Sequence, residues 1–153
     1  MRSRNVNMVD LNREAELNQA LELLHFGFRA IVAKPDQQLN ELGLTRLHHR
    51  ILFFVRKTPL VSVNELCRTL GISKQALNAP LRQLLDLELV EFNFAATDRR
   101  VKQLNLTQAG AALEQQLSGY QRQQFESIFT QVGGEAEAHW REVMQLLAAL
   151  LES

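Results

Sequence analysis

The chain has 153 residues, 46% of them hydrophobic, which suits one domain with a real core and attached helices. No apolar run approaches the roughly 18 residues that span a bilayer, and the residues before Asp10 are too polar for a signal peptide. A single cysteine excludes an internal disulfide framework. We therefore expect a cytoplasmic protein with no membrane segment.

The formal net charge is zero, but the charges are unevenly distributed along the chain. Residues 44–102 hold ten basic and five acidic side chains, a net of +5, whereas residues 1–43 carry −1 and residues 103–153 carry −4. A basic middle between acidic ends is typical of a local nucleic-acid surface. The alternative is an ordinary solvated basic face, because basic patches have many causes.

The first predicted helix runs from Asp10 to Lys34, where Pro35 is expected to end it and a polar linker, residues 35–43, to follow. Its apolar residues step by four, three, four and three, a heptad-like stripe that predicts packing against another helix. The stripe consists of Leu17, Leu21, Leu24, Phe28 and Ile31.

The middle of the chain begins with a helix capped by Thr45 that ends at Lys57. Ser62 opens the motif S-x-x-E, a capping box that predicts a helix from Val63 to about Leu70. Gly71 breaks this helix, and Ser73 caps the next, which occupies residues 73–87. Two short helices joined by a tight turn that contains glycine predict a helix-turn-helix.

Two alternating segments, Leu89–Phe94 and Val101–Leu106, predict a pair of strands directly after the helix-turn-helix. The tip between them, residues 95–100, carries two adjacent arginines, so the pair forms a basic wing. Thr107 then caps a long helix that ends at Gly133. The last helix carries a further apolar stripe that includes Trp140, Val143 and Leu147.

This order of elements and four motifs resemble the MarR family of winged helix-turn-helix regulators. The motifs are Leu44-Thr45, NELCRTLGISKQAL at 64–77, DRR at 98–100 and LNLTQAG at 104–110. The resemblance covers essentially the whole chain. It implies a homodimer whose first and last helices intertwine, recognition helices in successive major grooves of double-stranded DNA, wings at the minor grooves, and often a small-molecule effector.

The sequence departs from the family pattern at two positions. Glu88 stands where the family usually has glycine between the recognition helix and the wing, and a left-handed conformation there would cost glutamate more than glycine. Pro80 lies in the middle of the recognition helix and removes the hydrogen bond to the Ala76 carbonyl. We expect a bend or a locally widened turn there, which would set the angle at which the helix meets DNA.

The candidate DNA-binding residues of the recognition helix lie in its first two and a half turns. Gln75 and Asn78 can bond adenine bidentately, Lys74 and Arg82 can reach guanine or phosphate, and the Ser73 cap offers backbone N–H groups to a phosphate. The alternative is an exposed polar helix face without a ligand.

In the wing, Arg99 or Arg100 could enter a narrow minor groove, whose negative potential attracts guanidinium groups. The family resemblance favours Arg100, held by an ion pair with Asp98. The alternative is a hairpin turn whose charges only maintain solubility.

The remaining reactive residue types indicate structural roles. Cys67 is expected at the helix crossing, where a small buried thiol has no redox function. The histidines lack a metal-binding spacing, since His48 and His49 are adjacent and point about 100° apart on a helix. They are His25, His48, His49 and His139. No phosphate-binding glycine loop or nucleophile motif is present, so we expect neither an enzyme nor a cofactor.

We therefore predict a mainly α protein with a small β wing, built as an N-terminal dimerisation helix and linker (1–43), a winged helix-turn-helix (44–106) and C-terminal dimerisation helices (107–153). The predicted function is sequence-specific binding to a pseudo-palindromic operator by a homodimer, with repression as the expected outcome and a small-molecule effector implied by the resemblance. The alternative is a winged-helix module that binds protein or RNA.

Overall fold

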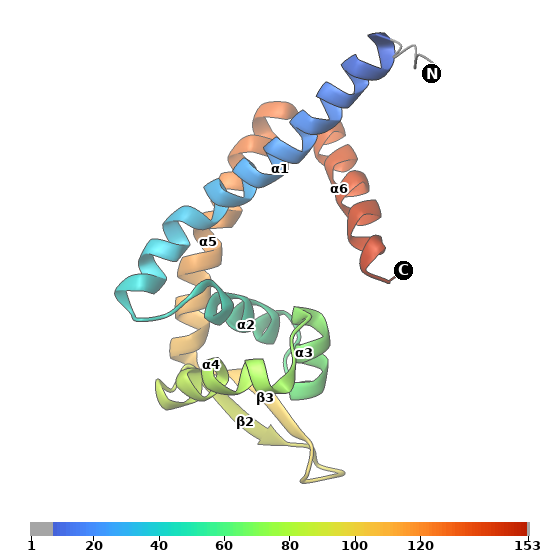
Figure 1. Ribbon diagram of the computed structural model, residues 1–153. Helices are drawn as coiled ribbons and strands as arrows, with labels where there is room; N and C mark the ends of the chain where they lie inside the picture. Colours follow the sequence, from blue (N-terminus) through green and yellow to red (C-terminus); the bar gives the residue numbers. More distant parts are fainter. Residues whose placement is uncertain (1–7, 153) are drawn as a thin grey trace.

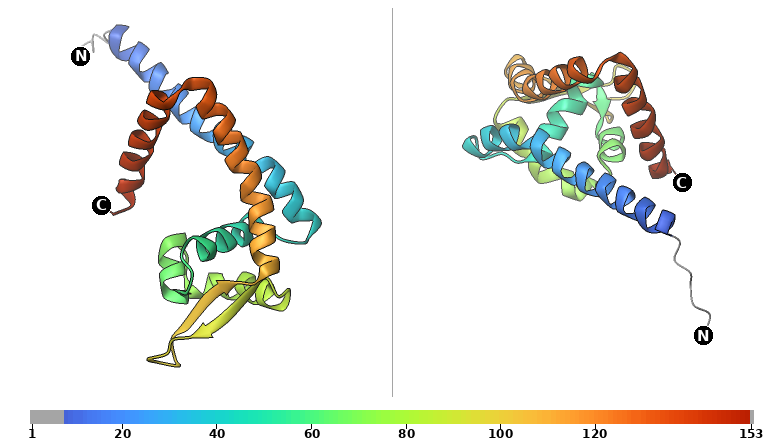
Figure 2. Two further views of the ribbon diagram at one scale, coloured as in Figure 1. Left: turned by 180° about the vertical axis from the view of Figure 1, so that it is seen from behind. Right: turned by 90° about the horizontal axis from the view of Figure 1, so that it is seen from above.

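The computed structural model describes residues 8–152. We distinguish two regions among them, a winged-helix lobe and a set of helical arms. The winged-helix lobe, residues 44–106, contains three short helices and a small sheet (Figure 1). The long helices α1 (Met8–Glu41) and α5 (Gln108–Val132) rise from this lobe, and α6 (Gly134–Ala148) folds back from the far end of α5 (Figures 1 and 2). Three helical segments extend away from the lobe, and we call them the arms: residues 10–31, 120–132 and 134–148.

Helix α1 spans Met8–Glu41, so the prediction that Pro35 ends it is wrong. Pro35 leaves the Ile31 carbonyl without its helical N–H donor. The side chain of Gln121 on α5 supplies the missing donor, with its Nε2 3.1 Å from the Ile31 oxygen. Burial of Leu39 in the core then holds the last turns in place, and the expected linker shrinks to a turn before Thr45.

The lobe contains α2, Arg46–Lys57; β1, Val61–Ser62; α3, Val63–Leu70; α4, Lys74–Asp86; β2, Val90–Phe94; and β3, Lys102–Leu106. The predicted helices and wing strands are confirmed to within a residue or two. Strand β1 was not predicted. It joins the outer edge of the wing as an antiparallel strand, in the order β1-β3-β2, with Val61 opposite Leu104.

The expected local signals set the helix boundaries of the helix-turn-helix. The hydroxyls of Ser62 and Ser73 each accept the backbone N–H three residues further on, at 3.1 and 3.0 Å. Gly71 takes the left-handed conformation that stops α3, with φ 68°. Helix α4 is α-helical throughout, including at Pro80, so the expected widened turn is not formed. The expected bend at Pro80 stays a prediction.

The exit from α4 explains the LNLTQAG motif. Glu88 has φ 59°, so this position is left-handed although it lacks glycine. The Thr107 hydroxyl donates to the Glu88 carbonyl at 2.6 Å and accepts the Gly110 N–H at 3.0 Å. A Cβ on Gly110 would lie 1.8 Å from the Leu89 carbonyl oxygen. Only glycine at 110 therefore lets the start of α5 pack against the α4–β2 connection.

Helix α5 spans Gln108–Val132, with Gly133 between it and α6, Gly134–Ala148, which continues as a 3-10 turn, Ala149–Glu152. An aromatic cluster holds the two helices together where they meet. Trp140 on α6 stacks against Phe125 and Phe129 on α5, with ring centroids 5.2 and 5.5 Å apart.

The hydrophobic core lies in the lobe and at the roots of α1 and α5. Among the described residues, every buried hydrophobic side chain falls between Val32 and Leu117. The apolar stripes of the arms are exposed instead, and α6 buries none of its described residues. The exposed residues include Leu17, Leu21, Leu24, Phe28, Ile128, Val132, Trp140, Val143 and Leu147. None of the helices within residues 8–152 is both long and apolar enough to cross a membrane.

Candidate nucleic-acid interface

Helix α4 separates its polar and apolar residues onto different sides. The buried residues are Leu77, Leu81 and Leu84, which anchor the helix in the core. The exposed residues include all five candidates on this helix and its cap: Ser73, Lys74, Gln75, Asn78 and Arg82. The structure therefore presents the predicted donors and acceptors to solvent on a helix whose other side is fixed.

The wing tip is a tight turn built around Asp98. The Asp98 N–H donates to the Ala95 carbonyl at 3.2 Å, and the Asp98 carboxylate accepts both the backbone N–H and the Nε–H of Arg100, at 3.0 and 3.2 Å. The expected ion pair is thus present. The Arg100 side chain remains 92% exposed, so the pair orients the guanidinium without covering it. Arg99 is exposed beside it.

Two residues of the same wing, Phe94 and Lys102, were not among the candidates predicted from the sequence. Phe94 pairs with Lys102 in the register of β2 and β3, and both lie on the sheet face that buries Val90. Phe94 is nevertheless 58% exposed. The alternation in VEFNF places Phe94 on the inner face, but its exposure there could not be predicted from the sequence.

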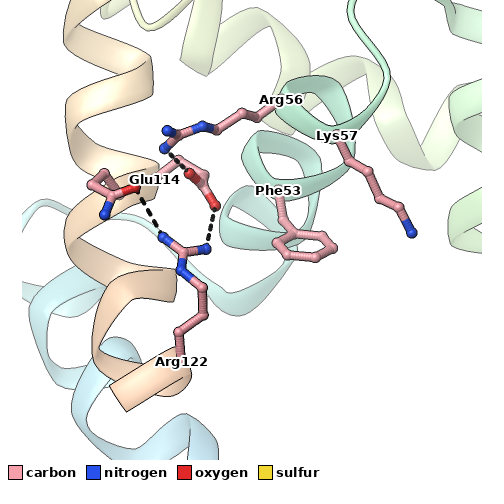
Figure 3. A pocket seen from close by; sticks show the side chains of 6 residues that line it. Phe53, Arg56, Lys57, Glu114 and Arg122 are labelled. Atoms are coloured by element: carbon pink, nitrogen blue, oxygen red, sulfur yellow. Dashed lines mark hydrogen bonds and ion pairs between the residues drawn. The ribbon is translucent and has the colours of Figure 1, made fainter. Parts of the chain in front are cut away.

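A second candidate site lies between α2 and α5, where an open hollow of about 340 Å³ is present (Figure 3). The Glu114 carboxylate at its wall is 2% exposed and pairs with Arg56 of α2 and, at 3.8 Å, with Arg122 of α5. The hollow is lined by Phe53, Arg56, Lys57, Glu114, Gln115 and Arg122. No effector residue could be predicted from the sequence, because these side chains meet only through the packing of α2 on α5.

The adjacent histidines of α2 are both buried, at 4% and 7% exposure, and contact different helices. The ring of His48 bonds Gln83 of α4, and the ring of His49 bonds the hydroxyl of Ser118 on α5, each at 2.9 Å. Burial lowers the pKa of His49, against the opposing effect of the carboxylates of Glu114 and Asp36. Within residues 8–152, no group of three or more His, Cys, Asp or Glu side chains could hold a metal ion.

Two further features of the lobe concern charge and the thiol. The Arg46 guanidinium donates to the Asp36 carboxylate of α1 at 2.6 Å, and this hydrogen bond raises the pKa of Arg46. One basic charge of the lobe is therefore used to hold α2 to α1.

Cys67 of α3 is buried in the core of the lobe, as expected for a structural thiol.

A helix-turn-helix followed by a basic β wing defines a winged-helix protein, and comparisons with known proteins identify the family. The model of the MarR family matches residues 42–101. The HTH-type transcriptional regulator PetP of Rhodobacter capsulatus is 35% identical over 134 residues, which cover 88% of this chain and 81% of PetP. The chain belongs to the MarR family of transcription regulators.

Solved structures share the fold at lower sequence identity. FabT of Streptococcus pneumoniae in complex with DNA superimposes with a TM-score of 0.77 at 19% identity, covering 89% of this chain and 97% of FabT. The DNA complex of Staphylococcus aureus MepR gives 0.65 at 18% identity, covering 84% of this chain and 96% of MepR. The predicted fold class and family resemblance are both confirmed.

Proposed function

We propose that this protein is a homodimeric, sequence-specific DNA-binding regulator that acts in the cytoplasm through a pseudo-palindromic operator. The observation that carries the proposal is the exposed polar side of α4, fixed by three buried leucines and followed by a wing with an exposed Arg100. FabT and MepR, which share the fold, were both solved bound to DNA. A binding role needs no catalytic group.

Helix α4 enters the major groove in this proposal. Gln75 and Asn78 read base edges, because their amides can donate and accept at adenine. Lys74 and Arg82 contact guanine or phosphate, and the free N–H groups after the Ser73 cap suit a phosphate oxygen. The three buried leucines stiffen the helix, which keeps the ordering cost of binding low.

The wing contacts the adjacent minor groove. Arg100 is the main contact, since its guanidinium is exposed and already oriented by Asp98. Arg99 lies next to it and adds a second positive charge near the phosphates. Such contacts depend on groove width and charge more than on base identity. The wing therefore contributes affinity and shape recognition, and α4 contributes most of the sequence specificity.

The arms pair with a second copy of this chain. Their apolar stripes lie on three helices and are exposed in a single chain, although soluble monomers rarely expose patches above a few hundred Å². In this arrangement residues 1–43 and 107–153 supply the dimerisation helices and residues 44–106 bind DNA. Dimerisation would fix the spacing of the two α4 helices and so the spacing of the operator half-sites.

The hollow between α2 and α5 is the proposed effector site. Three cationic side chains and one carboxylate line it, only Arg56 and Arg122 pair with that carboxylate, and Phe53 adds an aromatic wall, so a small aromatic carboxylate would fit its chemistry. A ligand in this position would touch both the lobe and an arm. In a thermal-shift screen of small aromatic carboxylates, stabilisation should be lost in Arg122→Ala. Equal stabilisation of the variant would contradict this site.

The main test is selection of duplexes from a random pool by the native protein, followed by fluorescence anisotropy. We expect enrichment of a sequence with two inverted half-sites and tight binding of that duplex. The same sequence as an RNA duplex is the second arm of the experiment. Enrichment of no DNA sequence, or equal binding of the RNA, would favour the winged-helix module that binds RNA or protein.

A further inference from the structure

The buried histidine His48 links the recognition helix to the start of α2. The ring has three neighbours within hydrogen-bond distance: the backbone N–H and the hydroxyl of Thr45, both 2.9 Å from Nδ1, and the Gln83 Oε1, 2.9 Å from Nε2. The Gln83 amide in turn donates to the Gly43 carbonyl at 3.3 Å. Gly43 and Thr45 lie in the turn that joins α1 to α2.

These contacts determine which nitrogen of the His48 ring carries the proton. A backbone N–H can only donate, so Nδ1 of His48 must be the acceptor and carry no proton. The single ring proton is therefore on Nε2, where it donates to the Gln83 Oε1, leaving the amide NH₂ of Gln83 for Gly43. The backbone N–H of Thr45 alone fixes this tautomer, since the Thr45 hydroxyl, which also lies 2.9 Å from Nδ1, can either donate or accept.

Gln83 lies outside the proposed DNA-reading side of α4. It follows Asn78 by five residues, which at about 100° per residue places it about 140° away around the helix. Its bonds run to the turn after α1, and α1 belongs to the arms. The His48–Gln83 pair thus ties α4 to α2 and to the turn that follows α1, separately from the leucines that anchor α4 in the core.

We propose that His48 and Gln83 are positioning residues for operator recognition, which fix the orientation of α4 relative to α1. This inference rests on the proposed function. Without the pair, only the buried leucines hold α4, so we expect the orientation of its polar side to vary and the observed affinity to fall by the fraction of molecules that remain competent. A dimer binds DNA through two α4 helices, so the fall in affinity occurs at each half-site. Nonspecific phosphate contacts tolerate misorientation, so specificity should suffer more than nonspecific binding.

The experiment compares variants of the full chain on two duplexes: the one the native protein selects from a random pool, and an unrelated duplex of equal length. Gln83→Leu removes an exposed side chain and leaves the core intact, whereas His48→Leu removes the ring. His48→Gln keeps an N–H near the position of Nε2. His49→Leu is the matched control, because His49 is the neighbouring buried histidine but bonds α5. Thermal unfolding is recorded for each variant.

Loss of one partly buried hydrogen bond per subunit should reduce the ratio of specific to nonspecific affinity by about tenfold in Gln83→Leu. The double variant His48→Leu/Gln83→Leu should lose no more than the worse single variant, and His48→Gln should recover most of the ratio. His49→Leu should lower the unfolding temperature without changing the ratio.

Three results would overturn the positioning role. They are an unchanged ratio in Gln83→Leu, additive losses in the double variant, and the same fall in the ratio for His49→Leu. If His48→Leu fails to fold, Gln83→Leu and His48→Gln still decide the question. Failure of the native protein to select any duplex would instead refute the proposed function itself, so the two failures are distinguishable.

Discussion

The winged-helix lobe and the arms are built from similar proportions of apolar residues but bury them differently. In the lobe, α2, α3, α4 and the sheet enclose residues such as Ile51, Leu66 and Leu104, which are fully buried. In the arms, the stripes on α1, α5 and α6 face outward, and Val143 and Leu21 are mostly exposed. The lobe completes its own core, whereas the arms present an apolar surface to be covered.

The junction between these regions is polar and specific. The buried carboxylate of Glu114 on α5 meets Arg56 of α2 and Arg122 of α5. The Gln121 side chain completes the hydrogen bonding of α1 next to Pro35. Directional contacts of this kind fix the angle between two packed helices more tightly than apolar packing alone. A change in the arms would therefore reach the lobe.

The largest expected effect comes from placing a charge on the exposed stripe of α6. Val143→Glu should convert the dimer to monomers and weaken operator binding at least about 100-fold, because each lobe would then bind its half-site alone. The lobe should remain folded, since it keeps its core. Analytical ultracentrifugation and anisotropy measure both effects. Gln145→Glu adds the same charge on another side of α6 and should remain dimeric. A Val143→Glu dimer of native affinity would show that the arms pair elsewhere.

Within the lobe, the two DNA-contacting elements should respond differently to truncation. Gln75→Ala should cost about 1–3 kcal/mol of binding and relax specificity at particular base pairs. Arg100→Ala should weaken binding evenly across sequences and lower the slope of log K against log salt by about one. Anisotropy titrations at several salt concentrations separate the two. An unchanged salt slope in Arg100→Ala would remove the wing from the interface.

A smaller effect is expected from protonation at the junction. Burial lowers the pKa of His49 in the folded chain, so below the unfolded value of about 6.5 the unfolded chain takes up a proton that the folded chain resists. Stability should therefore fall as the pH decreases from 7 towards 5, with no contribution from His49 above this window. Unfolding temperatures of native protein and His49→Gln should converge as the pH falls. Parallel curves would show that His49 titrates alike in both states.

The smallest effect concerns the strained exit from α4. Glu88 is left-handed, with φ 59°, a conformation that costs non-glycine residues about 1–2 kcal/mol. Glu88→Gly should therefore stabilise the lobe by about 1 kcal/mol in thermal or urea unfolding. Gly71→Ala, at the left-handed glycine that ends α3, should destabilise the lobe by a similar amount. If both variants lose stability, then contacts of the Glu88 side chain outweigh the backbone strain.

Much of the lobe could be predicted because its signals are local. The caps Ser62, Ser73 and Thr107 act within three residues of themselves, and the alternation of β2 and β3 is readable in a few positions. Strand β1 escaped prediction because two residues carry no period. Its assignment depends on Leu104, which lies 43 positions after Val61.

The errors and omissions share one cause, a partner distant in sequence. A proline inside a helix usually ends or kinks it. Helix α1 continues past Pro35 because the side chain of Gln121, from another helix, donates to the Ile31 carbonyl that Pro35 leaves without a donor. The histidines of α2 could be judged poor metal ligands from spacing alone. Their actual partners, Gln83 and Ser118, become visible only when α4 and α5 are packed on α2. The exposed donors of α4 were predictable, whereas the polar contacts of Gln83 that tie that helix to α2 and to Gly43 were not.

A hydroxyl-radical footprint on the selected duplex shows whether two α4 helices and two wings bind one DNA site. We expect protection of two half-sites related by an inverted repeat, with centres about one helical turn, roughly 34–36 Å, apart and flanking minor-groove protection from the wings. A single protected half-site, or uniform protection without a dyad, would contradict it.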